Sequence, residues 1–190
     1  VEAFIGRSNV KSTEEAALKA TKLIFENIEK VYEDGKNIEA RENMLVASFY
    51  AGVAFTRAYV GYVHAIAHNL GGMYGIPHGL ANAVILPYIL EFFGDSAHHR
   101  LAILADVAGI TEGPTTEKEN AEKFIEAIKE RILILAAPRL FISSIFIVVN
   151  NLLFFFSISS AWSVTIASSP QPNEFKFTSS TFGFFDTTSA

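Results

Sequence analysis

The chain has 190 residues, with 15 lysines and arginines against 20 aspartates and glutamates, and it contains no cysteine. This length suits one domain with a substantial core. The acidic balance and the lack of a basic stripe exclude nucleic acid as an expected partner. The lack of cysteine excludes disulfides and thiolate metal sites, and it suits a reducing compartment, so we expect a cytoplasmic protein.

Two long helices are predicted first. In residues 12 to 35, Ser12 and Glu15 have the spacing of a capping box, and Gly35 suits a left-handed helix end. The second helix follows in residues 38 to 60. Its sequence is apolar on nearly all sides from Met44 to Phe55, so we expect it to be buried in the centre of the fold.

Three of the five histidines lie close together in the next segment, which is otherwise apolar. His64 and His68 are four residues apart, so a helix would place both side chains on one face, with β-carbons about 5–6 Å apart. We expect the helix to end at the pair Gly71-Gly72, and a short loop then brings His78 back. Imidazoles in this pattern suit one divalent ion, such as zinc, iron, copper or nickel, although hydrogen-bonded core histidines would show the same spacing.

Apolar periodicity predicts three more helices, in residues 80–93, 97–108 and 115–130. Pro87 is expected to kink the first of them unless a neighbour replaces the lost hydrogen bond. Thr116 and Glu119 form a second capping-box pattern at the start of the last one. No alternating strand pattern occurs before residue 130, so we predict an all-α multi-helix bundle for residues 1 to 131.

Residues 132 to 190 differ in composition from the rest of the chain. From Leu140 onward only Glu174, Lys176 and Asp186 are charged, and this part holds ten of the seventeen phenylalanines. The segment could be a membrane anchor, a β-rich domain, or the product of a shifted reading frame or misassembled gene. We favour the last interpretation, so membrane association of this hydrophobic tail is not our preferred reading.

The histidine segment "GYVHAIAHNLGGMYGIPHGLANAVILP" resembles, without a gap, the signature of the iron-containing (group III) alcohol dehydrogenases. The first residues, "VEAFIGRS", resemble the stretch that follows this family's Asp-x-x-x-His-Ala pattern. Residues 12 to 130 are similar to its helical C-terminal domain. The resemblance therefore implies the dehydroquinate synthase-like helical bundle of that domain.

The resemblance also implies roles for the histidines. In the family, one Asp and three His hold a divalent metal, usually ferrous iron and sometimes zinc. Carried onto this chain, His64 and His78 correspond to two of these metal ligands. His68 corresponds to a histidine beside the nicotinamide and the substrate, which makes it the candidate catalytic proton relay. Its alternative role is a structural hydrogen bond to a backbone carbonyl.

The function implied by the resemblance is interconversion of primary alcohols and aldehydes with NAD(P). We expect the other two ligands to precede Val1, and no Gly-x-Gly-x-x-Gly phosphate loop occurs in the chain. We therefore expect a fragment that is inactive alone and depends on a missing cofactor domain. Small alcohols or aldehydes are the expected partners, and homo-oligomerisation is left open. The alternative is a non-enzymatic, membrane-associated or interaction protein that reuses the helical scaffold.

Overall fold

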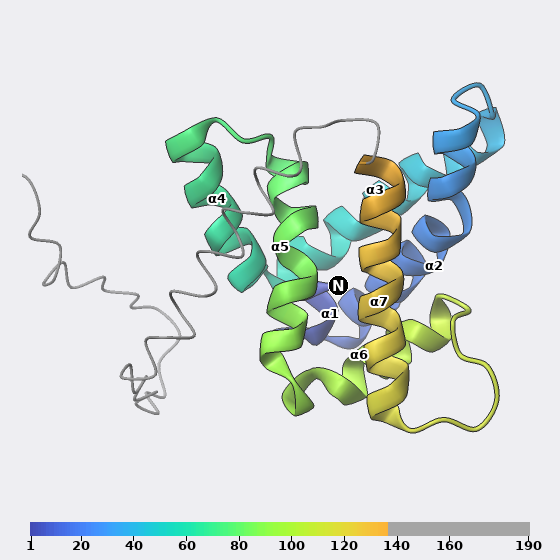
Figure 1. Cartoon of the computed structure of the whole chain (residues 1–190), viewed down its shortest axis with the longest axis vertical. Helices are drawn as coiled ribbons and strands as arrows, with labels where there is room; N and C mark the ends of the chain where they lie inside the picture. Colours follow the sequence, from blue (N-terminus) through green and yellow to red (C-terminus); the bar gives the residue numbers. More distant parts are fainter. Residues whose placement is uncertain (137–190) are drawn as a thin grey trace, which may run out of the picture.

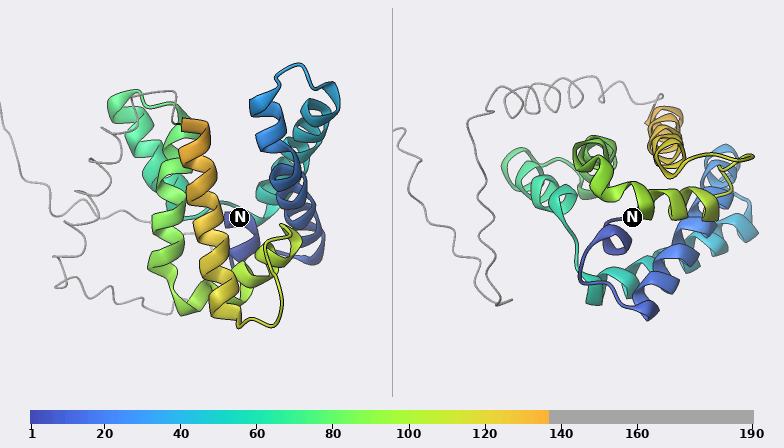
Figure 2. Two further views of the ribbon diagram at one scale, coloured as in Figure 1. Left: turned by 45° about the vertical axis from the view of Figure 1, so that its right-hand side comes forward. Right: turned by 90° about the horizontal axis from the view of Figure 1, so that it is seen from below.

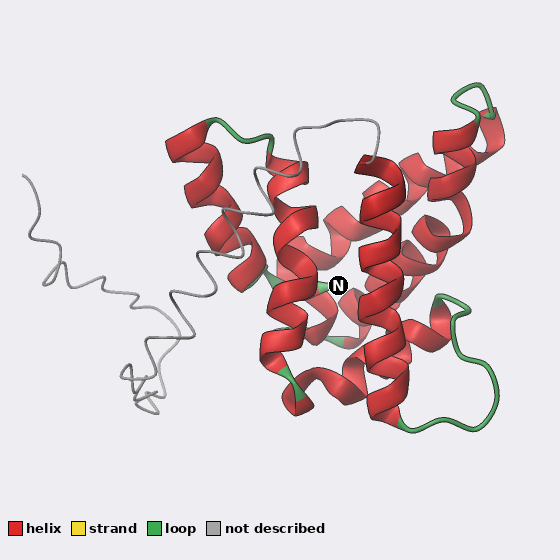
Figure 3. Cartoon of the chain, in the orientation of Figure 1, coloured by secondary structure: helices red, strands yellow, loops and turns green. Residues whose placement is uncertain are grey.

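The computed structural model describes residues 1–136, and within them the chain forms helices and no strand (Figure 3). The predicted all-α fold is therefore confirmed for this part of the chain. The helices, labelled in Figure 1, are α1 (Glu2–Ile5), α2 (Lys11–Glu33), α3 (Ile38–Ala58), α4 (Tyr62–Tyr74), α5 (His78–Phe93), α6 (Asp95–Val107) and α7 (Glu117–Ala136).

The start of α2 differs from the predicted capping box. The helix begins at Lys11, so Ser12 lies inside its first turn rather than at the cap. The hydroxyl of Thr13 accepts a hydrogen bond from the Val10 N–H and donates one to the Val10 carbonyl, both at 2.8 Å. Thr13 is buried and its hydroxyl closes the turn, so the prediction of Ser12 and Glu15 as the capping pair was wrong. At the other end α2 stops at Glu33, and Gly35 is not among the positive-φ glycines of residues 1–136.

The capping box at the start of α7 is confirmed. The Thr116 N–H donates to Glu119 Oε2 at 2.8 Å, and the Glu119 N–H donates to Thr116 Oγ1 at 3.2 Å. Each side chain thus satisfies a backbone donor that the helix cannot pair internally. The backbone hydrogen bond from Thr116 also lowers the pKa of the Glu119 carboxyl.

α3 lies at the side of the domain, not in its centre. It packs along α2, and Figure 2 shows the two helices as a pair beside the group formed by α4, α5 and α7. Ala47 and Ala54 are buried, whereas Leu45 is 73% exposed and Phe49 is 67% exposed. The prediction of a central helix was therefore wrong, because the small alanines make the close contact and the large apolar side chains face outward.

Two apolar clusters hold the helices together. The larger one joins α1, α2, α6 and α7 and includes Ala54 and Ala58 of α3 and Leu90 of α5; its fully buried side chains include Phe4, Leu101, Leu104 and Phe124. Burial of one such side chain contributes roughly 1.5–3 kcal/mol. The smaller cluster joins α4 to α5, and its buried members are Val63, Ala67, Leu70, Ala81, Val84, Ile85 and Ile89. α5 runs without interruption through the buried Pro87. The smaller cluster therefore holds together the two helices that carry the three histidines.

The hydrophobic tail predicted from residue 132 falls almost entirely outside the described residues. α7 continues past that boundary to Ala136, and the nature of residues 137–190 stays a prediction. Within residues 1–136 no single helix is long and apolar enough to cross a membrane. α3 and α4 together meet that test by length and composition, but they are bent by 104° where they join.

Candidate functional site

The helix that carries His64 and His68 is longer than predicted. α4 continues through Gly71 and Gly72 to Tyr74, and the capping residue Gly75, with a φ of 66°, donates its N–H to the Gly71 carbonyl at 3.0 Å. The predicted end at Gly71-Gly72 was therefore wrong. The apolar face of α4 packs against α5, and this packing outweighs the low helix propensity of Gly71 and Gly72. Gly75, rather than Gly71 or Gly72, takes the left-handed conformation that ends the helix.

A short turn then returns the chain toward α4. Pro77 is the residue that precedes α5, and His78 is the first residue of that helix. The sequence analysis predicted that a short loop brings His78 back toward the histidine helix. The structure confirms this return. The two histidines of α4 and the first residue of α5 therefore come from consecutive helices that pack against each other.

The three imidazole rings lie close together at this junction. Their ring centroids are 5.9 Å apart for His64 and His68, 5.3 Å for His64 and His78, and 5.2 Å for His68 and His78. His64 is half-buried, whereas His68 and His78 are exposed to solvent. The structure thus brings together all three histidines that the sequence singled out.

These distances can be compared with a metal site. Two imidazoles bound to one tetrahedral ion, with metal–nitrogen bonds of about 2.0–2.1 Å, have ring centroids roughly 5 Å apart. The separations of 5.3 Å between His64 and His78 and of 5.2 Å between His68 and His78 are both close to this value, and imidazole nitrogens suit iron and zinc. Within residues 1–136, however, no group of three or more histidine, aspartate or glutamate side chains is placed to hold an ion together.

Glu2 is a functional candidate that the sequence analysis missed. Its Oε2 lies 2.5 Å from His64 Nδ1, and its Oε1 accepts a hydrogen bond from the Val63 N–H at 2.9 Å. The Glu2 side chain is only 8% exposed. A carboxylate so deeply buried needs partners, and here it finds them on α4. The available signal was an acidic residue set between the apolar Val1, Ala3 and Phe4.

His78 has a polar neighbour of its own. The Asn82 side-chain amide donates to His78 Nε2 at 3.0 Å and to the His78 carbonyl at 3.0 Å. The buried Asn82 Oδ1 has no hydrogen-bond partner within residues 1–136. The same amide nitrogen lies 3.4 Å from His78 Nδ1, so Asn82 faces the ring edge that carries both nitrogens.

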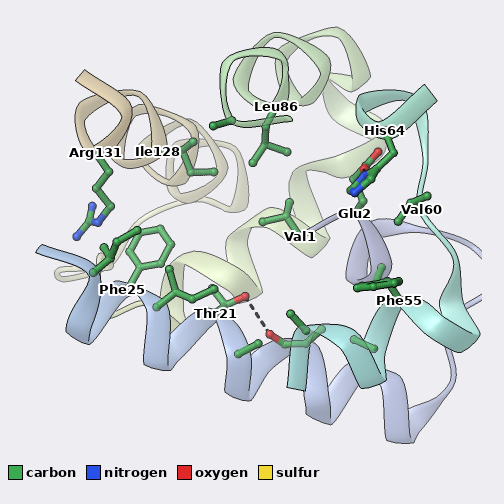
Figure 4. A pocket seen from close by; sticks show the side chains of 18 of the residues that line it. Val1, Glu2, Thr21, Phe25, Phe55, Val60, His64, Leu86, Ile128 and Arg131 are labelled. Carbon is green, nitrogen blue, oxygen red and sulfur yellow. Dashed lines mark hydrogen bonds and ion pairs between the residues drawn. The ribbon is translucent and has the colours of Figure 1, made fainter. Parts of the chain in front are cut away.

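An apolar cavity of about 370 Å³ lies next to Glu2 and His64. Figure 4 shows it between α2, α3, α5 and α7, with Glu2 and His64 at one end and Arg131 at the other. The Arg131 guanidinium lies 4.3 Å from the ring centroid of Phe25 and pairs with Glu29 at 3.2 Å. The cavity therefore has an apolar middle and polar groups at both ends.

Comparison with known proteins finds one matching family and several relatives. Residues 1–141 match the Fe-containing alcohol dehydrogenase family, C-terminal. The chain is 40% identical over 139 residues to 1,3-propanediol dehydrogenase from Klebsiella pneumoniae, a match that covers 73% of this chain and 36% of that protein. It is 35% identical over 129 residues to the NAD-dependent methanol dehydrogenase of Bacillus methanolicus, covering 68% of this chain and 34% of that one.

The fold agrees with a solved structure from the same group. The crystal structure of a 1,3-propanediol oxidoreductase superimposes with a TM-score of 0.68 at 39% sequence identity, covering 70% of this chain and 35% of that chain. The chain thus spans about a third of the length of the relatives that it matches.

Proposed function

The chain belongs to the iron-containing alcohol dehydrogenase family, and we propose that its helices form the metal-holding half of the active site of an NAD(P)-dependent alcohol dehydrogenase. The observation that carries this proposal is the convergence of His64, His68 and His78 from two helices, with ring centroids 5.2 to 5.9 Å apart. Two relatives are named as dehydrogenases of 1,3-propanediol and of methanol, so primary alcohols and the matching aldehydes are the proposed substrates.

Each histidine has a proposed task. His64 and His78 would each hold the ion through one ring nitrogen. A bound ferrous or zinc ion supplies a Lewis acid for the substrate oxygen, while NAD(P) carries the hydride. His68 lies one helical turn from His64 and is exposed, so it would move a proton between the substrate hydroxyl and solvent.

We further propose that the 190-residue chain alone binds metal weakly and does not turn over. Two imidazoles form an incomplete ligand set for zinc or iron, since zinc sites use three or four protein ligands. The relatives are about three times as long as the part matched here, so the cofactor-binding half would come from outside residues 1–190.

The test joins the described helices to a complete enzyme. A chimera carries residues 1–136 in place of the matching segment of the Klebsiella 1,3-propanediol dehydrogenase. We expect it to bind one metal ion per chain and to oxidise primary alcohols with NAD(P). His64→Ala and His78→Ala should each remove bound metal. His68→Ala should keep the metal and lose turnover.

His99→Ala is the matched control, because His99 is an exposed histidine that pairs with Glu117 on the surface, not with the other three. A folded chimera that binds no metal would contradict the proposal. So would equal metal content in the His64→Ala and His99→Ala chimeras.

A further inference from the structure

We propose that Glu2 is a positioning residue for His64. It holds the imidazole with its proton on Nδ1, so that the lone pair of Nε2 is free for a metal ion. This inference rests on the proposed function for its metal, but its first step, the choice of ring nitrogen, is a property of the metal-free chain.

The two oxygens of the Glu2 carboxylate have separate partners. Oε1 accepts the backbone N–H of Val63, and Oε2 lies 2.5 Å from His64 Nδ1. Val63 is in the first turn of α4, where backbone donors have no partner within the helix. The residue before that helix, Gly61, provides no side-chain cap. One carboxylate therefore both caps α4 and contacts the ring that α4 presents.

The chemistry of a carboxylate decides the tautomer. An ionised carboxylate accepts hydrogen bonds and cannot donate them, so the imidazole nitrogen that faces it must carry a proton. Nδ1 of His64 faces Glu2, so in the neutral imidazole Nε2 is the nitrogen with a free lone pair. Metal-ligating histidines commonly donate their second ring N–H to a carboxylate, which fixes the ring orientation and raises the basicity of the ligand.

The backbone that carries Glu2 is itself held in place. The neighbouring Ala3 and Phe4 are buried in the larger apolar cluster. The Phe4 carbonyl accepts a hydrogen bond from the Asn9 side chain at 2.7 Å, and the Arg100 guanidinium lies 4.9 Å from the Phe4 ring centroid. A short helix anchored in the core thus presents Glu2 to α4 from a fixed direction, which is what a positioning role requires.

The first experiment measures the tautomer of His64 in the metal-free full chain by nitrogen-15 NMR of the imidazole rings. The wild-type ring should carry its proton on Nδ1. In Glu2→Gln, the amide can keep an oxygen toward the Val63 N–H while its NH₂ group faces His64. Nδ1 must then accept, and the proton should move to Nε2. Glu2→Asp keeps an acceptor-only group and should keep the proton on Nδ1.

The second experiment titrates the same chains with zinc and follows the imidazole signals. We expect Glu2→Gln to bind zinc about 10–100-fold more weakly than wild type, and Glu2→Asp to recover part of the loss. Glu14→Gln is the matched control. It removes a carboxylate that pairs with Arg100 rather than with a histidine, and it should bind zinc as wild type does.

The outcomes separate this inference from the proposed function. A wild-type His64 with its proton on Nε2 would overturn the positioning role. So would a Glu2→Gln chain that loses folding stability while its tautomer and zinc affinity stay unchanged, because that result leaves Glu2 only its cap on α4. The expected change of tautomer supports the positioning of His64 whatever the zinc affinity of the isolated chain, whereas a folded chimera that binds no metal contradicts the metal-holding function instead.

Discussion

The Glu2 carboxylate lies directly beside Gly61: a methyl group added at Gly61 would lie 2.8 Å from Glu2 Oε1. The contact is closer than two non-bonded atoms tolerate, and the Glu2 side chain is the part that can move. The glycine therefore lets Glu2 approach the start of α4 without a shift of its side chain, and from there the carboxylate reaches Val63 and His64.

Gly61→Ala should accordingly release Glu2 from α4. We expect the free energy of unfolding to fall by about 1.5 kcal/mol or more, because hydrogen bonds to a buried carboxylate are lost. Gly72→Ala is the control: it lies inside α4 with nothing within 4 Å of the added methyl group. That variant should gain about 0.5–1 kcal/mol. Urea unfolding of both variants measures the difference, and equal effects would contradict the role of Gly61.

Asn82 should compete with a metal ion for His78. Its amide donates to His78 Nε2 at 3.0 Å, so an ion bound at that nitrogen must displace it. In Asn82→Ala we expect zinc to bind about fivefold more tightly, since the hydrogen bond is worth about 1 kcal/mol. Asn69→Ala, which loses only a bond to the Ala65 carbonyl, should leave zinc affinity unchanged. Weaker binding in Asn82→Ala would instead mean that Asn82 orients the ring for the metal.

The capping box of α7 should contribute to stability in a pH-dependent way. Thr116→Ala should lower the free energy of unfolding by about 1 kcal/mol at neutral pH, as is typical for loss of an N-cap hydroxyl. The hydrogen bonds from Thr116 lower the folded-state pKa of Glu119 below its ordinary value of 4.5. Their stabilisation is therefore present above that value and lost as the pH falls through the folded-state pKa.

The gap in stability between wild type and Thr116→Ala should then narrow below a pH of about 4.5. Chemical denaturation at a series of pH values measures it. A gap that stays constant down to the acid limit of folding would show that the Thr116 hydroxyl does not bond the Glu119 carboxylate, because the bond from the Thr116 N–H persists in the variant.

The two faces of α3 should respond very differently to substitution. Leu45 is 73% exposed, so Leu45→Lys should change the free energy of unfolding by no more than about 0.5 kcal/mol. Ala47 is fully buried where α3 packs on α2, so Ala47→Leu should overpack that contact and cost about 1–3 kcal/mol. Thermal or urea unfolding compares them. A large loss in Leu45→Lys would place that face of α3 in a contact.

The local patterns of the sequence were good predictors where neighbours in the chain decide the structure. The capping box of Thr116 and Glu119 formed because its donors and acceptors lie within one helical turn. The start of α2 shows the limit of such patterns. Both Ser12 and Thr13 have a hydroxyl that can bond the backbone at a helix start. In the structure the Thr13 hydroxyl forms these bonds, because the Thr13 side chain is buried and reaches Val10.

The sequence by itself determined the helical class of the described residues and the spacing of His64, His68 and His78, because helical periodicity fixes which side chains share a face. Only the tertiary structure decided how far α4 runs, since packing on α5 outweighs Gly71 and Gly72. It also decided that α3 lies at the side of the domain. The partnership of Glu2 with His64 joins residues 62 positions apart. No local rule predicts such a contact, because it depends on how separate helices pack.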